Sequence, residues 1–224
     1  MVRPSPPPSY LGVRTDLLAM VPPSLTVQTV LDVGCAAGAT VGALRERHPG
    51  LVATGIELDP ESATRARTQV DEVLVGDADV HLSRLASREA RFDLVILGDV
   101  LEHLVDPDRT LRRVRMLCPA GRAIVSLPNV GHLSTFGALL EGRWPYRDRG
   151  LHDRTHLRWF GRKNLPELFA GAGFREVRRH VRHRIIERPH PYNEALEPLL
   201  RWVPVVRHFT AYQFLSLLAP APEA

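Results

Sequence analysis

The sequence predicts an α/β fold built on a doubly wound, mostly parallel sheet. Short apolar and β-branched runs alternate along the chain with longer segments of helical periodicity, as in repeated strand–helix–strand units. The first run, residues 29–33, passes directly into small residues that include Gly34 and Gly38, and then into a helix-like segment. This pattern is typical of a buried strand that ends in a tight turn beneath a helix N-terminus.

The remaining elements follow the same alternation. The expected strands are residues 29–33, 52–57, 72–75, 92–97, 122–127, 174–183 and 211–218. The expected helices are residues 10–20, 38–47, a segment that begins at Asp59-Pro60, 101–115 and 163–172. Pro60 favours a helix start because proline suits the first helical position. Gly171 and Gly173 are expected to end the last of these helices.

The chain divides into a short arm and one domain. Residues 1–9 are rich in proline and poor in apolar side chains, which predicts a disordered N-terminal arm. Residues 10–224 are expected to form a single domain. Within it, residues 128–160 lose all periodicity while histidine, arginine, tryptophan and tyrosine accumulate. A long irregular segment in a compact domain is more often functional than not, so we expect a cap over a binding site.

Composition bounds the setting of the protein. A chain of 224 residues with 44% hydrophobic and 24% charged residues is ordinary for one globular domain. Its two cysteines, Cys35 and Cys118, both lie in apolar stretches, which predicts a reducing, cytoplasmic environment. No apolar run reaches the ~18 residues of a membrane helix, and no signal-peptide core is evident. We therefore expect no membrane partner.

The basic charge balance does not by itself indicate nucleic-acid binding. The formal net charge is +4, and Lys163 is the only lysine. Arginines crowd residues 143–207, often beside acidic residues. This mixture indicates a solvated face rather than a groove that follows a phosphate backbone. No nucleic-acid partner is expected.

Acidic residues end the second and third expected strands. Glu57 lies 25 positions after Asp32, and its two carboxylate oxygens suit the two hydroxyls of a ribose. Asp77 follows the third strand and can accept a hydrogen bond from an exocyclic amine such as adenine N6. Asp79 competes for that role, and a structural turn cap is the alternative for Asp77.

Four motifs follow one another along the chain. They are Leu31-Asp32-Val33-Gly34-Cys35 with Gly38, Gly55-Ile56-Glu57, Gly76-Asp77, and Phe92-Asp93-Leu94-Val95 leading to Asp99-Val100-Leu101-Glu102-His103. In this order they resemble class I S-adenosylmethionine-dependent methyltransferases, in particular the small-molecule group that includes ubiquinone O-methyltransferases. The resemblance implies a Rossmann-like seven-stranded sheet with an antiparallel last strand. It also implies S-adenosylmethionine as the cofactor, bound across the carboxyl ends of the strands.

The resemblance also assigns donor-binding residues. They are Asp32, Gly34, Gly38, Glu57, Asp77, Gly98 and Asp99. Ala36 stands where the family commonly has a second glycine, and its methyl group narrows the dihedral angles open to the turn. A dinucleotide-binding oxidoreductase would instead need the Gly-x-Gly-x-x-Gly spacing, which this turn lacks.

Two histidines are the candidate catalytic bases. His132 and His156 lie in stretches that resemble the acceptor side of the small-molecule group. An imidazole with a pKa near ~6.5 can accept a hydroxyl proton at neutral pH. We favour His156, because Asp153 is placed to orient its ring and the pair Trp159-Phe160 to close the pocket.

A metal site is the alternative use of the histidine-rich motifs. Asp99, Glu102 and His103 have the i, i+3, i+4 spacing of one helix face, and His152 or His156 could add a ligand. Small-RNA terminal methyltransferases use a site of this kind. We expect instead that these residues shape the pocket without a metal.

The sequence therefore predicts methyl transfer from S-adenosylmethionine to a small-molecule acceptor, at a hydroxyl. Two alternatives stay open. The first is a non-catalytic donor-binding module. The second is an RNA methyltransferase with a metal-assisted site, against which the shortage of aromatic residues interleaved with basic ones argues.

Overall fold

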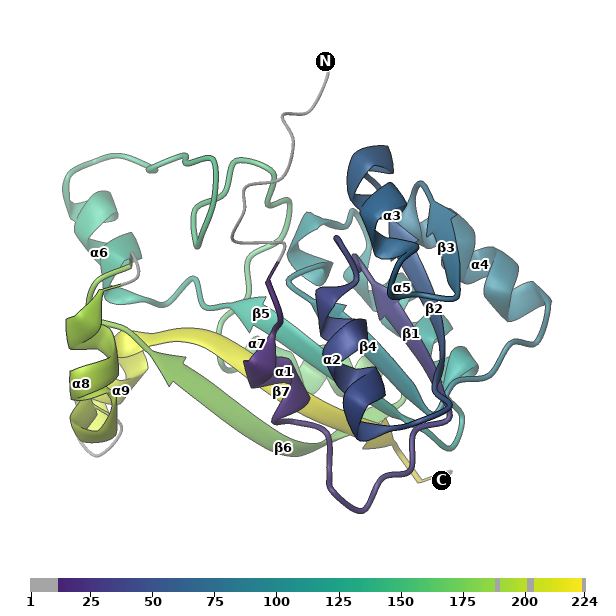
Figure 1. Ribbon diagram of the computed structural model, residues 1–224. Helices are drawn as coiled ribbons and strands as arrows, with labels where there is room; N and C mark the ends of the chain where they lie inside the picture. Colours follow the sequence, from purple (N-terminus) through teal and green to yellow (C-terminus); the bar gives the residue numbers. More distant parts are fainter. Residues whose placement is uncertain (1–11, 188–189, 201–203, 223–224) are drawn as a thin grey trace.

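The computed structural model describes residues 12–187, 190–200 and 204–222 of the chain. In these residues, seven strands form one sheet in the order β3-β2-β1-β4-β5-β7-β6 (Figure 1). Strands β1 to β5 are parallel, and β7 runs antiparallel to both β5 and β6. The expected doubly wound sheet with an antiparallel last strand is confirmed. The predicted arm, residues 1–9, lies outside the described residues.

The strands and helices have the following bounds. The strands are β1 (Thr29–Val33), β2 (Val52–Glu57), β3 (Glu72–Val75), β4 (Leu94–Gly98), β5 (Arg122–Pro128), β6 (Phe174–His183) and β7 (Ala211–Pro220). The helices are α1 (Thr15–Leu18), α2 (Ala39–Arg47), α3 (Pro60–Ala66), α4 (Ala78–Ser87), the 3₁₀ turn η2 (Leu101–His103), α5 (Pro107–Leu117), α6 (Leu133–Leu140), α7 (Asn164–Gly171), α8 (Pro191–Leu200) and α9 (Pro204–Thr210).

Alternate side chains of each central strand enter two different apolar cores. Leu31 and Val33 of β1 pack with residues of α4, α5 and α7 on one face of the sheet. Val30 of the same strand packs with residues of α1, α2 and α3 on the other. Because both faces are covered, the central strands must be apolar on both sides, which explains their continuous hydrophobic runs.

The parallel register brings the carboxyl ends of the central strands to one edge of the sheet. Val33 of β1 pairs with Ile56 of β2 and with Leu97 of β4. The loops that leave these strands therefore meet above the same edge. In open α/β sheets this edge is where ligands bind.

The prediction of one continuous helix over residues 101–115 is wrong, because the chain forms two separate elements there. The short turn η2 ends at His103, and α5 begins only at Pro107. Asp106 caps α5 by accepting a hydrogen bond from the Arg109 amide, and proline occupies the first helical position. Both features start a new helix rather than continue an old one.

Four helices lie in segments where the sequence predicts none. They are α4, α6, α8 and α9. Helix α6 interrupts the cap segment 128–160, and α8 and α9 lie in a proline-punctuated stretch. Conversely, the expected helix 10–20 is described only as the single turn α1. Figure 1 shows α6, α8 and α9 grouped at the end where β6 and β7 reach beyond the other strands.

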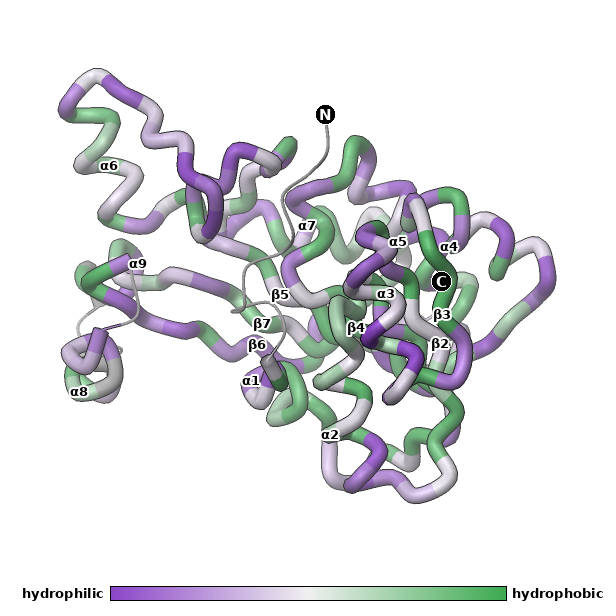
Figure 2. Tube along the Cα trace, turned by 45° about the horizontal axis from the view of Figure 1, so that its top comes forward, coloured by the Kyte–Doolittle hydropathy of each residue, from purple (hydrophilic) through white to green (hydrophobic). Residues whose placement is uncertain are grey.

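The cap differs in character from the sheet. Figure 2 shows mostly hydrophilic residues in the segment that leads from α6 toward α7. A polar segment of this kind covers a solvent-filled space better than it covers a core. Among the described residues, no helix has the length and apolar content that crossing a membrane requires.

Two glycines differ in how closely the rest of the chain packs around them. A Cβ built on Gly121, before β5, would lie 2.6 Å from the carbonyl oxygens of Phe92 and Asp93. Backbone cannot yield cheaply, so Gly121→Ala should lower the free energy of unfolding by about 1–3 kcal/mol. Gly137 in α6 has nothing within 4 Å of such a Cβ, so Gly137→Ala should raise it by about 0.5–1 kcal/mol. Urea unfolding followed by circular dichroism measures both, and a stabilising Gly121→Ala would contradict this packing.

Candidate active site

A cleft of about 820 Å³ opens above the carboxyl edge of the parallel strands. One wall is the turn after β1 together with the start of α2, and the other is the cap segment with the ends of β6 and β7. Of the predicted donor-binding residues, the lining includes Asp32, Gly34, Gly98 and Asp99. The sheet edge and the cap therefore enclose one continuous space.

The turn after β1 is held in an unusual backbone conformation. Gly34, Ala36 and Gly38 all have positive φ, at 73°, 48° and 77°. For Ala36 the left-handed region costs about 1–2 kcal/mol, which is the restriction predicted for its methyl group. Glu57 stabilises this turn, since its Oε2 accepts a hydrogen bond from the Ala36 amide at 2.8 Å. Its Oε1 accepts from the Asp59 amide at 2.9 Å.

The first turn of α2 faces the cleft. Ala37, Ala39 and Thr40 line the cavity, and the helix begins immediately after Gly38. The amide groups of a helix N-terminus carry partial positive charge and attract electron-rich groups. The β1 turn thus offers backbone donors at the cleft surface.

Asp32 places an acidic side chain at the floor of the cleft. It is only 5% exposed, and it has no hydrogen-bond partner within the described residues. Burial and the neighbouring Glu57 carboxylate raise the pKa of Asp32 to about 7. A cationic ligand group in the cleft would favour the ionised form of this carboxylate.

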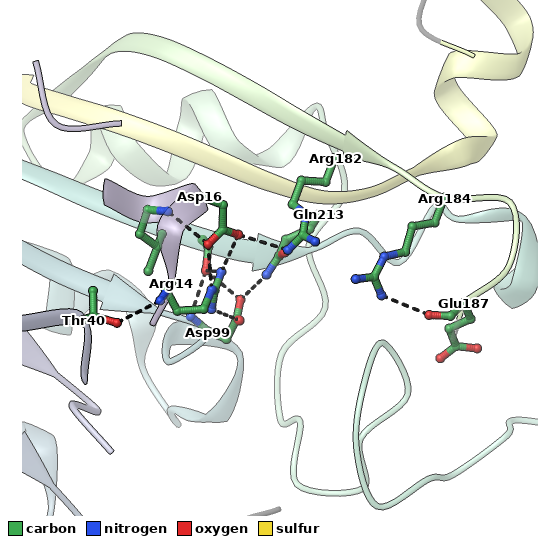
Figure 3. A network of polar contacts seen from close by, with 10 residues as sticks. Arg14, Asp16, Thr40, Asp99, Arg182, Arg184, Glu187 and Gln213 are labelled. Carbon is green, nitrogen blue, oxygen red and sulfur yellow. Dashed lines mark hydrogen bonds and ion pairs between the residues drawn. The ribbon is translucent and has the colours of Figure 1, made fainter. Parts of the chain in front are cut away.

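Asp99, at the end of β4, is held by residues from distant parts of the chain. Its carboxylate contacts Arg14 Nη1 at 2.6 Å, accepts from Ser126 Oγ at 2.7 Å, and accepts from the Gln213 side-chain amide. Burial alone would lower the pKa of Arg14, but Asp99 and Asp16 raise it above its usual value. Figure 3 shows the side chains of Arg14, directly before α1, Asp99, directly after β4, and Gln213, on β7, converging on one point.

Three predicted donor-binding residues are not among those that line the cleft. Gly38 caps α2, and Glu57 supports the β1 turn as described above. Asp77 caps α4 by accepting from the Val80 amide at 3.1 Å, which is the structural alternative. The competing Asp79 is bound by Arg109, Thr110 and Arg113. The ribose role of Glu57 and the adenine role of Asp77 stay predictions.

His156 lines the cleft and has one ring nitrogen fixed. Its Nδ1 lies 3.2 Å from the Leu151 carbonyl oxygen, which can only accept. The neutral ring therefore carries its proton on Nδ1 and has a lone pair on Nε2. Burial and the adjacent His103 lower the pKa of His156 to about 4. The Trp159 ring packs edge-on at 5.5 Å, whereas Asp153, expected to orient His156, instead bonds Thr155.

His132 is fully buried and does not line the cleft. Its Nδ1 accepts from the Ser134 amide at the start of α6, and its Nε2 donates to the Arg184 carbonyl oxygen at 2.9 Å. Both nitrogens are thus used within the protein, and burial lowers the pKa of the ring. His132 therefore does not reach the cavity, and of the two candidate bases it is His156 that lines it.

The residues of the alternative metal site are only partly brought together. Glu102, His103 and His156 have ligand-type atoms within 4.8 Å of one another. Glu102 is 1% exposed with no partner for Oε2 among the described residues, and burial with Asp99 nearby raises its pKa well above the ordinary value. Asp99 is held apart by Arg14, and His152 is buried against Thr135. Glu102, His103 and His156 could together coordinate a cation. The expectation that no metal binds here stays a prediction.

Several cleft residues are absent from the sequence-based predictions. Arg14, Arg182, Arg184, Tyr212 and Gln213 all line the cavity. The sequence holds one usable signal, because Gln213 is the one amide side chain in the mostly apolar segment 211–220. The arginines of β6 alternate with apolar residues as in any half-exposed strand, so their pattern does not distinguish them.

A family model described as a methyltransferase domain matches residues 11–179 of the chain. The chain is 32% identical over 152 residues to malonyl-acyl carrier protein O-methyltransferase of Geobacter sulfurreducens, covering 66% of this chain and 56% of the relative. It is 29% identical over 158 residues to ubiquinone biosynthesis O-methyltransferase of Psychrobacter arcticus, covering 67% and 60%. The chain thus spans less than two thirds of the length of these relatives.

Solved structures share the fold over nearly the whole chain. A SAM-dependent methyltransferase from Archaeoglobus fulgidus has a TM-score of 0.64 and 16% identity, with 92% of this chain and 91% of that one covered. A Haloferax volcanii methyltransferase, solved with the Trm112 activator, has a TM-score of 0.61 and 20% identity, covering 94% and 89%. This chain belongs to the methyltransferase domain family and has the fold of class I S-adenosylmethionine-dependent methyltransferases.

Proposed function

We propose that this chain transfers the methyl group of S-adenosylmethionine to a hydroxyl of a small-molecule acceptor. The observation that carries the proposal is the shared cleft. One cavity is lined both by the glycine-containing β1 turn with Asp32 and by His156, whose Nε2 lone pair is set by the Leu151 contact. A donor site and a proton acceptor in one enclosed space are what hydroxyl methylation needs.

The donor fits the residues that the motifs assign to it. The buried Asp32 carboxylate suits the cationic end of the methionine part, and the β1 turn with the α2 N-terminus offers amide donors. Each oxygen of Glu57 accepts one backbone hydrogen bond, which leaves lone pairs for ribose hydroxyls because a carboxylate has about four acceptor positions. Asp77, at the α4 cap, is proposed for the adenine amine.

Transfer would then be a direct displacement. The acceptor oxygen forms a bond to the methyl carbon as the carbon–sulfur bond breaks, and S-adenosylhomocysteine is the second product. The hydroxyl proton passes to Nε2 of His156. Positioning supplies most of the acceleration. The lowered pKa of His156 keeps the ring neutral at pH 7 but weakens it as a base, so its share of the acceleration is the smaller one.

The comparisons support this chemistry without extending to the acceptor. Both relatives named above are O-methyltransferases. We infer a small-molecule acceptor, no nucleic-acid partner and a cytoplasmic setting, which the two free, buried cysteines support. The metal-assisted RNA alternative has the Glu102, His103 and His156 group in its favour, and a donor-binding module has no specific observation in its favour.

Removing the Glu57 carboxylate should weaken donor binding. Glu57→Ala loses the proposed ribose contacts, so S-adenosylhomocysteine should bind about 1–3 kcal/mol less tightly. Isothermal titration calorimetry measures the affinity, and Glu61→Ala on the exposed start of α3 is the matched control. Unchanged affinity in a folded Glu57→Ala protein would contradict the ribose role.

Donor affinity should depend on pH through Asp32. The pKa of about 7 means that the carboxyl is largely protonated at pH 6 and ionised at pH 8. A cationic donor binds the ionised form, so S-adenosylmethionine affinity should rise about tenfold over this range. In Asp32→Asn only the titration of the ligand itself remains. Equal pH dependence in the two proteins would show that Asp32 does not face the donor.

Loss of His156 should reduce turnover without affecting the donor. His156→Ala removes the proposed base and should lower kcat about 10²–10⁴-fold, with S-adenosylhomocysteine affinity intact. The acid limb of the wild-type pH–rate profile should lie near pH 4, below the ordinary imidazole value, and should vanish in the variant. This experiment requires an acceptor found by radiolabel transfer.

His132→Asn is the matched control, because asparagine can still cap α6 and kcat should stay near normal. Normal kcat in His156→Ala would remove the base role. Loss of wild-type activity after chelation, with recovery on adding a divalent cation, would favour the metal alternative instead.

A further inference from the structure

The side of the cleft formed by the cap segment and the chain around the end of β6 is rich in arginine. Its lining there includes Arg147, Arg149, Arg154, Arg182 and Arg184, with Asp148 and Glu187 as the acidic residues. Such a concentration of one charge in a half-enclosed space attracts anions. What matters is which of these arginines the protein itself neutralises.

Three of the five arginines have carboxylate partners. Arg147 lies 2.9 Å from Glu187, and Arg154 lies 2.8 Å from Asp148. Arg182 lies 3.0 Å from Asp16, on the side of the Asp99 network. Among the described residues, Arg184 and the exposed Arg149 have no carboxylate partner.

Arg184 differs from Arg149 in being built into the wall. Its guanidinium carbon lies 4.3 Å from the centre of the Tyr212 ring, and its Nη1 donates to the Glu187 carbonyl oxygen at 3.1 Å. Tyr212 is itself fixed, because its ring packs edge-on against His132 and its carbonyl accepts from the Asn129 amide. The side chain is therefore held in place from two sides.

The surroundings of Arg184 leave its charge incompletely compensated. Burial lowers its pKa, which means that the site weakens the hold on the proton instead of supplying a counter-charge. A guanidinium removed from water without a carboxylate is unfavourable, and an anionic ligand relieves that cost. The planar fork of arginine suits bidentate binding of a carboxylate or phosphate group.

Figure 3 shows that Arg182, on β6, and Arg184, directly after β6, point toward different partners. Arg182 reaches toward Asp16 and Gln213, beside the Asp99 network. Arg184, two residues later, stands apart from that network and points toward Glu187. Arg182 is thus neutralised within the protein by Asp16, whereas Arg184 lies in the cleft wall without a carboxylate partner among the described residues.

We propose that Arg184 binds an anionic group of the methyl acceptor, so that the substrate is a small molecule carrying a carboxylate or a phosphate. This inference rests on the proposed function, because it takes the part of the cleft beside Arg184 as the binding site of the methyl acceptor. A nucleic-acid backbone is a poorer fit, since it requires several exposed, unpaired cations in a row. Here most of the arginines are paired within the protein.

The test uses anion binding, which does not require the natural acceptor. The full-length protein loaded with S-adenosylhomocysteine is titrated calorimetrically with malonate, benzoate and inorganic phosphate. Malonamide and benzamide serve as uncharged counterparts. At least one anion should bind the wild type, and Arg184→Gln should weaken that anion at least about tenfold. Malonamide and benzamide should bind the wild type and Arg184→Gln with equal affinity. The relative affinities of malonate, benzoate and phosphate show whether the site prefers a carboxylate or a phosphate.

Two further variants exclude general explanations. Arg149→Gln removes the same charge from the exposed rim and should change anion affinity less than about threefold, as expected for a screened surface charge. Arg184→Lys retains the charge without the planar fork and should recover part of the affinity, which also covers the case of an unfolded glutamine variant. The wild type and the variants should bind S-adenosylhomocysteine equally.

The outcomes decide between the levels of the proposal. Anions that bind the wild type no better than Arg184→Gln and Arg184→Lys, or an equal loss in Arg149→Gln, would overturn the anion site while leaving the donor site intact. Failure of the wild type to bind S-adenosylhomocysteine would contradict the proposed function and, with it, the acceptor role of Arg184.

Discussion

The side of the cleft at the ends of β4 and β5 depends on one carboxylate, that of Asp99 directly after β4. It contacts Arg14 before α1, Ser126 on β5 and Gln213 on β7, so three segments far apart in the sequence are held to one point. Arg14 also donates its backbone amide to Thr40 in α2, which connects the N-terminal segment to the helix that faces the cleft. Charge-assisted bonds of this kind are strong when partly buried. They fix the distance between the two sides of the sheet edge that a donor would bridge.

Two titratable residues beside this network, Glu102 and His156, have shifted pKa values. Glu102 has no salt-bridge partner among the described residues, and burial together with the nearby Asp99 carboxylate raises its pKa. His156 is likewise kept neutral by burial and by His103. Burial therefore disfavours a charge on Glu102 and on His156, which line the cleft together with the Asp99–Arg14 ion pair.

The sequence predicts the sheet well because the strands carry their own signal. Runs such as residues 94–98 are apolar on both faces, and strand ends are marked by Glu57 and Asp77. The missed helices lack such a signal. Helix α6 starts from a histidine cap, and α4 is capped by an aspartate that the sequence assigns equally well to a ligand. The site is harder still, because Arg14, Arg182 and Gln213 meet only through tertiary contacts. The same limit applies to His132, whose burial beneath Arg184 and Tyr212 depends on the path of the chain after β6.

Backbone strain around the cleft has a consistent place in this arrangement. Ala36 and Asp99 both have left-handed φ angles, of 48° and 58°, and both lie where a parallel strand leaves the sheet toward the ligand edge. Each is compensated by side-chain hydrogen bonds, to Glu57 in one case and to Arg14, Ser126 and Gln213 in the other. Strain of this kind persists only when its surroundings over-determine the conformation. Glu57 and Asp99, the acids at the ends of their strands, therefore hold the backbone at the edge of the cleft in place.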